Sequence, residues 1–83
     1  MNELRVGNRL RQWRADKGLT QADLAKLAKV SRKTINTVEN EVFVPSVQLA
    51  LVLSQVFGTT VEELFYLVSD EARAITMPTG HSR

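Results

Sequence analysis

Residues that begin or end helices recur at short intervals along most of this chain. Gly18 and Gly58 are expected C-terminal stops for helices, and Pro45 ends any helix that approaches it from before. Between these points, apolar residues recur at the three- and four-residue spacing of amphipathic helices. The chain is therefore restricted to a set of short helices. The N-terminal capping side chains that open four of them are Thr20, Ser31, Ser46 and Thr60.

The predicted fold class is all-α: a compact five-helix domain over residues 1–68, followed by a tail over residues 69–83. Ile75 and Met77 are the only large apolar residues of the tail, so we expect it to be flexible or to contact a partner. The first helix is expected over residues 6–17 and the fifth over residues 61–67. The three helices between them are expected to start at the caps Thr20, Ser31 and Ser46 and to end near 28, 40 and 57.

Composition limits the classes of function. The chain has 83 residues, enough for one domain with a thin core, and no cysteine, which excludes a disulfide scaffold, a thiolate zinc site and a cysteine nucleophile. His81 is the only histidine, so neither a metal nor another cofactor is expected. No apolar run reaches the length of a membrane span, and the N-terminus lacks a signal-peptide stretch, so a cytoplasmic location is expected. No nucleophile–base pair or phosphate-binding glycine loop is present, and an enzyme is not expected.

Charge is distributed unevenly. Residues 1–45 contain nine Lys and Arg against five Asp and Glu, whereas residues 46–83 contain two against four. A basic half beside an acidic half indicates a polyanionic partner for the basic half. The alternative is an ordinary solvated charged surface.

The segment over residues 20–40 contains two short helices joined by a tight turn. Ala25 is small where the two helices must cross, Val30 fills the turn, and Ile35 and Val38 turn the second helix of the pair toward the core. The opposite face of that helix is polar and cationic. This pattern predicts a helix-turn-helix whose second helix enters the major groove of DNA, with a plain helical hairpin as the alternative. The side chains left on the outer face are Ser31, Arg32, Lys33, Asn36, Thr37 and Asn40.

These residues resemble the Cro/repressor-type helix-turn-helix family of bacteria and their phages, and the resemblance covers about residues 5–67. It implies a small DNA-binding transcriptional regulator. The matching stretches are Leu10–Arg11 with Arg14, Lys17–Gln21, Leu24–Ala25, Val30–Arg32, Thr34–Ile35, Glu39–Asn40, Pro45–Ser46, Leu49–Leu51, Val56–Gly58 and Glu62–Phe65.

The resemblance also implies roles for single residues. Arg14 and Glu39 match a pair that forms a partly buried ion pair between the first and third helices. Arg32 and Lys33 would reach base edges, a guanine being the hypothesis for Arg32, because its fork fits guanine O6 and N7. The other expected base contacts are Thr37 and Asn36, and the expected phosphate contacts are Gln21, Ser31, Thr34 and Asn40.

Three features depart from the family pattern. Glu41 stands where many members have glycine, a residue that takes the left-handed conformation without strain. Either Glu41 takes that conformation at a cost of about 1 kcal/mol, or the loop after the third helix is built differently. Val52 stands where a charged residue is usual, and the tail has no counterpart.

A dimer on an inverted repeat is expected, because one helix-turn-helix reads few base pairs. Its predicted surface is Phe65, Tyr66, Val68 and Val52, unless these residues close the monomer core, and residues 72–77 are a candidate strand across the dimer.

Three functions fit the sequence. The first is a sequence-specific, dimeric regulator that reads double-stranded DNA with the helix Arg32–Asn40, as a repressor or autoregulator, the controllers of restriction–modification systems included. The second is the antitoxin of a toxin–antitoxin pair, whose tail would fold on the toxin. The third is a protein-interaction module that keeps the fold without binding DNA.

Overall fold

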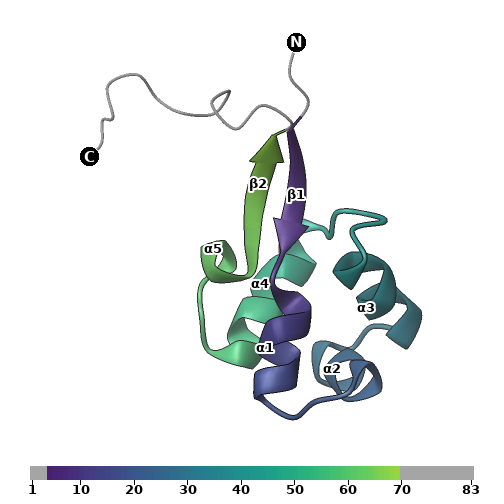
Figure 1. The fold of residues 1–83 in the computed structure, drawn as a ribbon. Coiled ribbons are helices and arrows are strands. Elements are labelled where there is room, and N and C mark those ends of the chain that lie inside the picture. The colour runs from purple at the N-terminus through teal and green to yellow at the C-terminus, as the bar shows by residue number, and fades with distance from the viewer. Residues whose placement is uncertain (1–3, 70–83) are drawn as a thin grey trace.

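The structure is a computed structural model that describes residues 4–69 (Figure 1). The predicted tail, apart from Ser69, and the candidate strand over 72–77 lie outside the described residues. Five helices stand between two strands in chain order. The elements are β1 (Leu4–Asn8), α1 (Leu10–Asp16), α2 (Gln21–Ala28), α3 (Arg32–Glu39), α4 (Val47–Phe57), α5 (Val61–Leu64) and β2 (Phe65–Ser69).

Side-chain caps begin four of the five helices, as the sequence predicts. Each capping oxygen accepts a hydrogen bond from the backbone N–H three residues further on, which satisfies one of the unpaired donors of the first turn. At α2 the cap is reciprocal, because Asp23 in turn accepts from the backbone N–H of Thr20 at 2.9 Å. Gly58 ends α4 with a left-handed φ of 68°.

The five predicted helices are present, but the domain is not all-α, because β1 and β2 form a two-stranded antiparallel sheet. The register runs from Leu4 opposite Ser69 to Asn8 opposite Phe65. Consequently α1 begins at Leu10 instead of residue 6, and α5 ends at Leu64 instead of residue 67.

Local chemistry explains both boundaries. The side chain of Asn8 accepts a hydrogen bond from the N–H of Leu10 at 3.0 Å, so it serves the start of α1 as a cap would. After α5, the chain turns to extended backbone at Phe65, with φ −127° and ψ 147°. The run of aromatic and branched side chains that follows favours a strand over a continued helix.

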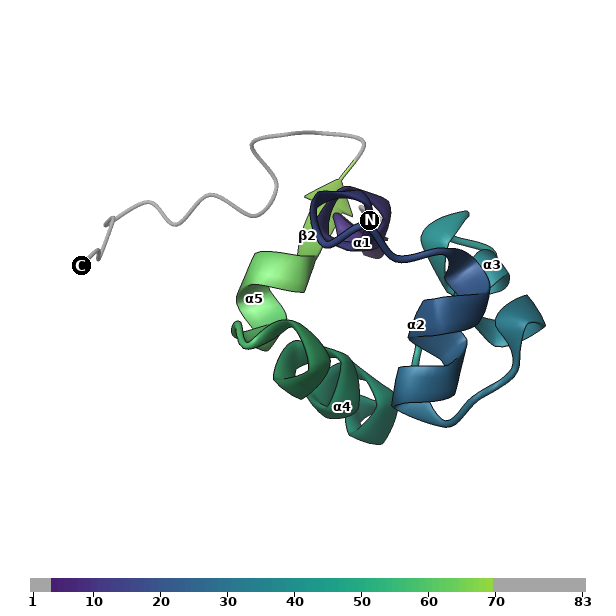
Figure 2. The same ribbon diagram turned by 90° about the horizontal axis from the view of Figure 1, so that it is seen from below.

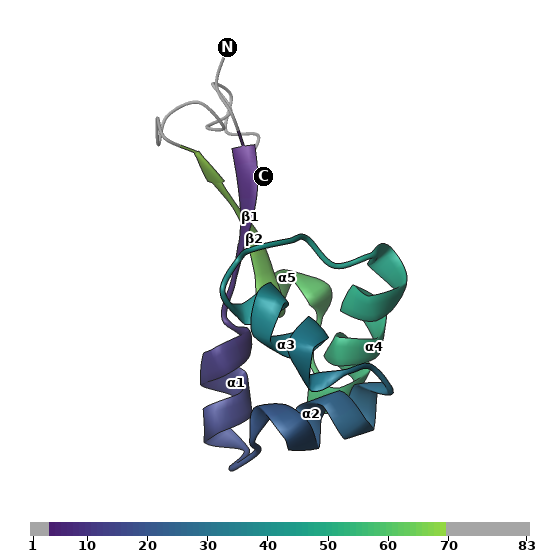
Figure 3. The same cartoon turned by 90° about the vertical axis from the view of Figure 1, so that its right-hand side faces the viewer.

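The β1–β2 sheet extends from one end of the helical body, and we call it the arm (Figures 1 and 3). Two isolated strands are marginally stable, so the arm needs additional contacts. Tyr66 supplies them: its ring lies over Gly7, where a Cβ would come within 2.6 Å of the ring, and the guanidinium of Arg9 lies 4.5 Å from the ring centroid. The backbone N–H of Arg9 also donates to the carbonyl of Leu64 at 2.8 Å.

The helices surround one hydrophobic core (Figure 2). Its fully buried members come from α1, α2, α3, α4 and α5, so every helix contributes to it. Trp13 packs against this core, with its ring centroid 5.9 Å from that of Phe57. The largest fully buried side chains are Leu10, Leu24, Ile35, Leu53, Leu64 and Val38.

Candidate nucleic-acid interface

Helices α2 and α3 are joined by a turn of three residues. Lys29 takes a left-handed conformation there, with φ 61°, and the N–H of Val30 donates to the carbonyl of Ala25 at 3.0 Å. Ala25 and Ala28 are buried, which allows the two helices to pack closely. This arrangement is a helix-turn-helix, with α3 at the outer face of the molecule (Figure 3).

The two faces of α3 differ in chemistry. Ile35 and Val38 are buried in the core, whereas Arg32, Lys33 and Asn36 are exposed and line a shallow hollow on the surface. The exposed residues carry two cations and an amide, which suit phosphates and base edges. The structure therefore brings these three predicted base-contacting residues together on one exposed surface.

The hydroxyl groups of α3 bond mainly within the helix. Ser31 and Thr34 share a hydrogen bond of 2.9 Å between their hydroxyl oxygens, and Ser31 also caps the helix. Thr37 is half-buried, and its hydroxyl donates to the carbonyl of Thr34 at 2.9 Å. Its methyl group remains as the part suited to a thymine methyl.

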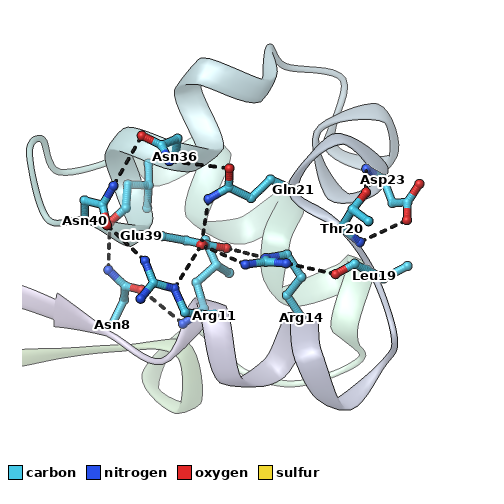
Figure 4. A network of polar contacts seen from close by, with 12 residues as sticks. Asn8, Arg11, Arg14, Leu19, Thr20, Gln21, Asp23, Asn36, Glu39 and Asn40 are labelled. Atoms are coloured by element: carbon cyan, nitrogen blue, oxygen red, sulfur yellow. Dashed lines mark hydrogen bonds and ion pairs between the residues drawn. The ribbon is translucent and has the colours of Figure 1, made fainter.

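Glu39 is the centre of the polar contacts behind α3 (Figure 4). Its side chain is fully covered, and its two oxygens accept from Nε and Nη2 of Arg14 at 2.6 and 3.2 Å. The predicted ion pair is thus present. Arg14 also donates to the carbonyl of Leu19 at 3.0 Å, so its guanidinium connects α1 both to α3 and to the segment before α2.

Burial alone would raise the pKa of Glu39, because it penalises the charged form. The hydrogen bonds from Arg14 and Gln21, the positive charge of Arg14 and the hydrogen bond from Arg11 outweigh burial, and the pKa of Glu39 lies below its usual range. The hydrogen bond to Glu39 correspondingly raises the pKa of Arg14. Both groups are charged at neutral pH.

Two predicted phosphate contacts, Gln21 and Asn40, lie on either side of Glu39. Gln21 Nε2 donates to Glu39 Oε1 at 3.0 Å, and Asn40 Oδ1 accepts from Arg11 Nη2 at 2.9 Å. The role of Arg11 was not predicted. Its signal in the sequence is its position three residues before Arg14, which places both on one face of α1, toward the same carboxylate.

Asn8 is a second residue that the sequence analysis missed. Its Nδ2 donates to the carbonyl of Val38 at 2.8 Å, while its Oδ1 accepts from the start of α1. This one amide connects the base of the arm to the last turn of α3. This hydrogen bond therefore connects the arm directly to α3.

Glu41 follows α3 in the left-handed conformation that glycine favours, with φ 61°. The backbone is held there by hydrogen bonds from Glu41 N to the carbonyl of Val38 and from Val42 N to that of Thr37. The helix end therefore has the conformation expected of a glycine-containing relative, and the glutamate carries the predicted strain. Its carboxylate lies 4.0 Å from the guanidinium of Arg5.

The four residues predicted for a dimer surface do not form one patch in the monomer. Phe65 is buried in the core, whereas Tyr66 is 38% exposed on the arm. Val68 is half-buried opposite Arg5 in the sheet. Val52 lines a hollow between α2 and α4, together with Leu27 and Leu49.

Over residues 4–69, no helix has the length and hydropathy needed to cross a membrane. In the same part of the chain, no group of three or more His, Asp or Glu is placed to hold a metal ion.

The fold and the exposed face of α3 define a helix-turn-helix domain of the DNA-binding type. The profile of the helix-turn-helix family, of Cro/C1 type, matches residues 10–64, and the chain belongs to this family. An uncharacterized HTH-type transcriptional regulator of Methanocaldococcus jannaschii is 42% identical over 64 residues, which are 77% of this chain and 97% of that protein. The family indicates a DNA-binding transcriptional regulator and not an enzyme.

Solved crystal structures resemble this one as well. The clp gene regulator ClgR of Corynebacterium glutamicum is 31% identical with a TM-score of 0.61, and the match covers 65% of this chain and 57% of that one. A protein from Bacteroides fragilis has a TM-score of 0.67 at 21% identity, covering 74% of this chain and 98% of the other. The second likeness concerns the fold alone.

Proposed function

We propose that this chain is a sequence-specific regulator that binds an inverted repeat in double-stranded DNA as a homodimer and represses transcription, its own included. The observation that carries the proposal is the two-sided character of α3. Its apolar face fixes the helix in the core, and its outer face presents Arg32, Lys33 and Asn36 without a covering element. A rigidly held, cationic helix of this kind is suited to the major groove.

Arg32 and Lys33 stand at the start of α3, the end of a recognition helix that contacts base edges in this kind of domain. The guanidinium of Arg32 can donate two parallel hydrogen bonds to guanine, and Lys33 can reach the same atoms as a point charge. Gln21 and Asn40 would hold the backbone on either side, which sets the register of α3 without reading sequence.

The first experiment is selection of binding sites from a random duplex library at physiological salt, with the purified full chain. Enrichment of an inverted repeat whose half-sites lie about 10 base pairs apart is expected. Arg32→Ala and Lys33→Ala should each relax preference at particular positions of the site. Lys26→Ala is the matched control, since Lys26 is an exposed cation of α2 whose charge acts on Asp23. Selection that enriches no sequence would refute the proposal.

The proposed dimer uses the face of β2 that carries Tyr66 and Val68. Val68→Glu tests it without breaking the arm, because the new carboxylate would stand opposite Arg5 in the sheet. Sedimentation velocity should show a dimer for the unmodified chain and a monomer for this variant. Leu67→Glu, on the opposite face of the same strand, is the control and should leave the dimer intact.

The repressor role is tested with a reporter promoter that contains the selected site. Expression of the chain should lower reporter activity, and Arg32→Ala should restore it. Increased activity would instead make the chain an activator.

The antitoxin function is the second candidate, and one observation favours it. Leu27 is 53% exposed and lines the hollow between α2 and α4, and Leu51 and Val47 are 53% and 76% exposed elsewhere on α4. Exposed apolar surface of this kind is typical of a protein contact. Co-expression with the neighbouring reading frame decides this candidate: relief of growth arrest by this chain supports it, and the absence of any toxic neighbour rejects it.

A further inference from the structure

Five side chains close into one ring of hydrogen bonds on the surface that carries the predicted DNA contacts (Figure 4). Arg11 from α1 and Glu39 from α3 are its charged members, and the other three are amides. The contacts in order are Arg11 Nη2 to Asn40 Oδ1 at 2.9 Å, Asn40 Nδ2 to Asn36 Oδ1 at 3.2 Å, Asn36 Nδ2 to Gln21 Oε1 at 3.4 Å, Gln21 Nε2 to Glu39 Oε1 at 3.0 Å, and Arg11 Nε to Glu39 Oε1 at 3.5 Å.

All hydrogen bonds of the ring run in one direction, from the cation to the anion. A guanidinium can only donate and a carboxylate can only accept, so the two charged ends determine which way each amide between them is turned. Asn40 must offer its oxygen to Arg11, and Gln21 must offer its nitrogen to Glu39. Asn36, in the middle, is fixed by both neighbours.

This direction suits a phosphate contact. Each amide nitrogen has two hydrogens and uses one in the ring, so Gln21 and Asn40 each keep one N–H uncommitted among the described contacts. A phosphate oxygen accepts hydrogen bonds from N–H groups, and it repels an amide carbonyl oxygen that faces it instead of an N–H group. Turning either amide over would exchange its donor for an acceptor.

We propose that Arg11 is a positioning residue for DNA binding: it fixes the amide orientations of Asn40, Asn36 and Gln21 so that the uncommitted N–H groups of Asn40 and Gln21 face the phosphate backbone. The proposal rests on the proposed function of the chain as a DNA-binding regulator. Glu39 contacts only Gln21 among the three amides, whereas Arg11 is the charged member of the ring that contacts Asn40. Arg11 supplies the opposite end of the ring, and its fork spans Asn40 and Glu39 at once, which the point charge of a lysine cannot do.

The experiment compares Arg11→Met and Arg11→Lys with the unmodified chain, using the duplex selected from the random library. Dissociation constants are measured over a range of salt concentrations. Both variants should bind about tenfold more weakly at every salt concentration, with the slope of affinity against salt unchanged. Lys17→Met is the matched control, because it removes one positive charge from an exposed residue after α1, outside the ring and the arm, and should bind like the unmodified chain.

A second readout examines the ring without DNA. The side-chain amide signals of Asn36, Asn40 and Gln21 in nitrogen-15 NMR spectra should move toward the positions of free amides in both Arg11 variants. Backbone signals of the core and the melting temperature should stay close to those of the unmodified chain.

The outcomes distinguish a failure of the positioning role of Arg11 from a failure of the proposed DNA-binding function. If Arg11→Lys binds like the unmodified chain and Arg11→Met lowers the salt slope by about one, Arg11 contacts a phosphate directly and the positioning role is overturned. Unchanged side-chain amide signals in Arg11→Met would overturn it as well. If the unmodified chain itself selects no sequence, the proposed function fails, and the DNA-side role of Arg11 fails with it.

Discussion

Replacing Glu39 by Gln should destabilise the domain strongly. The change keeps the shape of the side chain but removes its charge from a fully covered position, where it faces Arg14 at 2.6 Å. Arg14 is only 16% exposed, so its guanidinium would lose its counterion without gaining full hydration. Breaking a buried pair in this way costs about 3 kcal/mol, a large share of the roughly 5–10 kcal/mol that stabilises a domain of this size.

Thermal unfolding followed by far-ultraviolet circular dichroism measures this cost. At pH 7 the melting temperature of Glu39→Gln should be lower by about 12–24 °C. The pKa of Glu39 is depressed in the folded state, so its stabilisation is complete above the unfolded value of about 4.3 and is lost as the pH falls through the folded value. The gap between the two proteins should therefore narrow as the pH falls below about 4.3 and close once the pH is below the lowered folded pKa of Glu39.

The double variant Arg14→Met with Glu39→Gln tests the physical cause. Because it also removes the unpaired cation, it should be more stable than Glu39→Gln alone. A melting temperature for Glu39→Gln within about 3 °C of the unmodified chain at pH 7 would refute the reasoning. So would a gap between the two proteins that does not change with pH.

Three further changes follow from the fold, each checked by urea unfolding at pH 7. Thr20→Ala removes the reciprocal cap with Asp23 and should lower the free energy of unfolding by about 1 kcal/mol. An unchanged free energy of unfolding would show that the cap does not stabilise the domain. Glu41→Gly relieves the left-handed strain at φ 61° and should raise stability by about 0.5–1 kcal/mol, whereas a decrease would show that the Arg5 contact matters more. Gly7→Ala places a Cβ 2.6 Å from the Tyr66 ring and should cost about 1–3 kcal/mol, with a change in tyrosine fluorescence; an unchanged arm would contradict the packing described.

The sequence predicted the helix-turn-helix well because its signals are local. Ser31 caps α3 and Ile35 turns it inward, and both signals lie within the helix they specify. The position of Arg14 three residues after Arg11 was equally visible, but its meaning depends on Glu39, which arrives from another helix. Patterns within one helix were therefore enough to predict the helix-turn-helix, whereas the role of Arg11 depends on a contact between helices.

The arm could not be predicted in the same way. Val6 and Leu10 are spaced as on a helix, so the sequence predicts residues 6–8 of β1 as the start of the first helix. The apolar residues after Leu64 likewise extend the predicted fifth helix. A strand needs a partner, and the partner of β1 stands at the far end of the domain. Nothing in the neighbourhood of either segment indicates that pairing.

The pairing of the first and last described elements also sets the order in which the chain folds. The helical body can form from contacts between successive helices, whereas the arm must bring together residues as far apart as Leu4 and Ser69. Closing a loop of that length in an open chain costs about 3–4 kcal/mol of chain entropy, and the folded body removes this cost because it brings Arg9 beside Leu64. We therefore expect the arm to close last in refolding and to open first, ahead of global unfolding, and its backbone amides to exchange with solvent faster than those of α3.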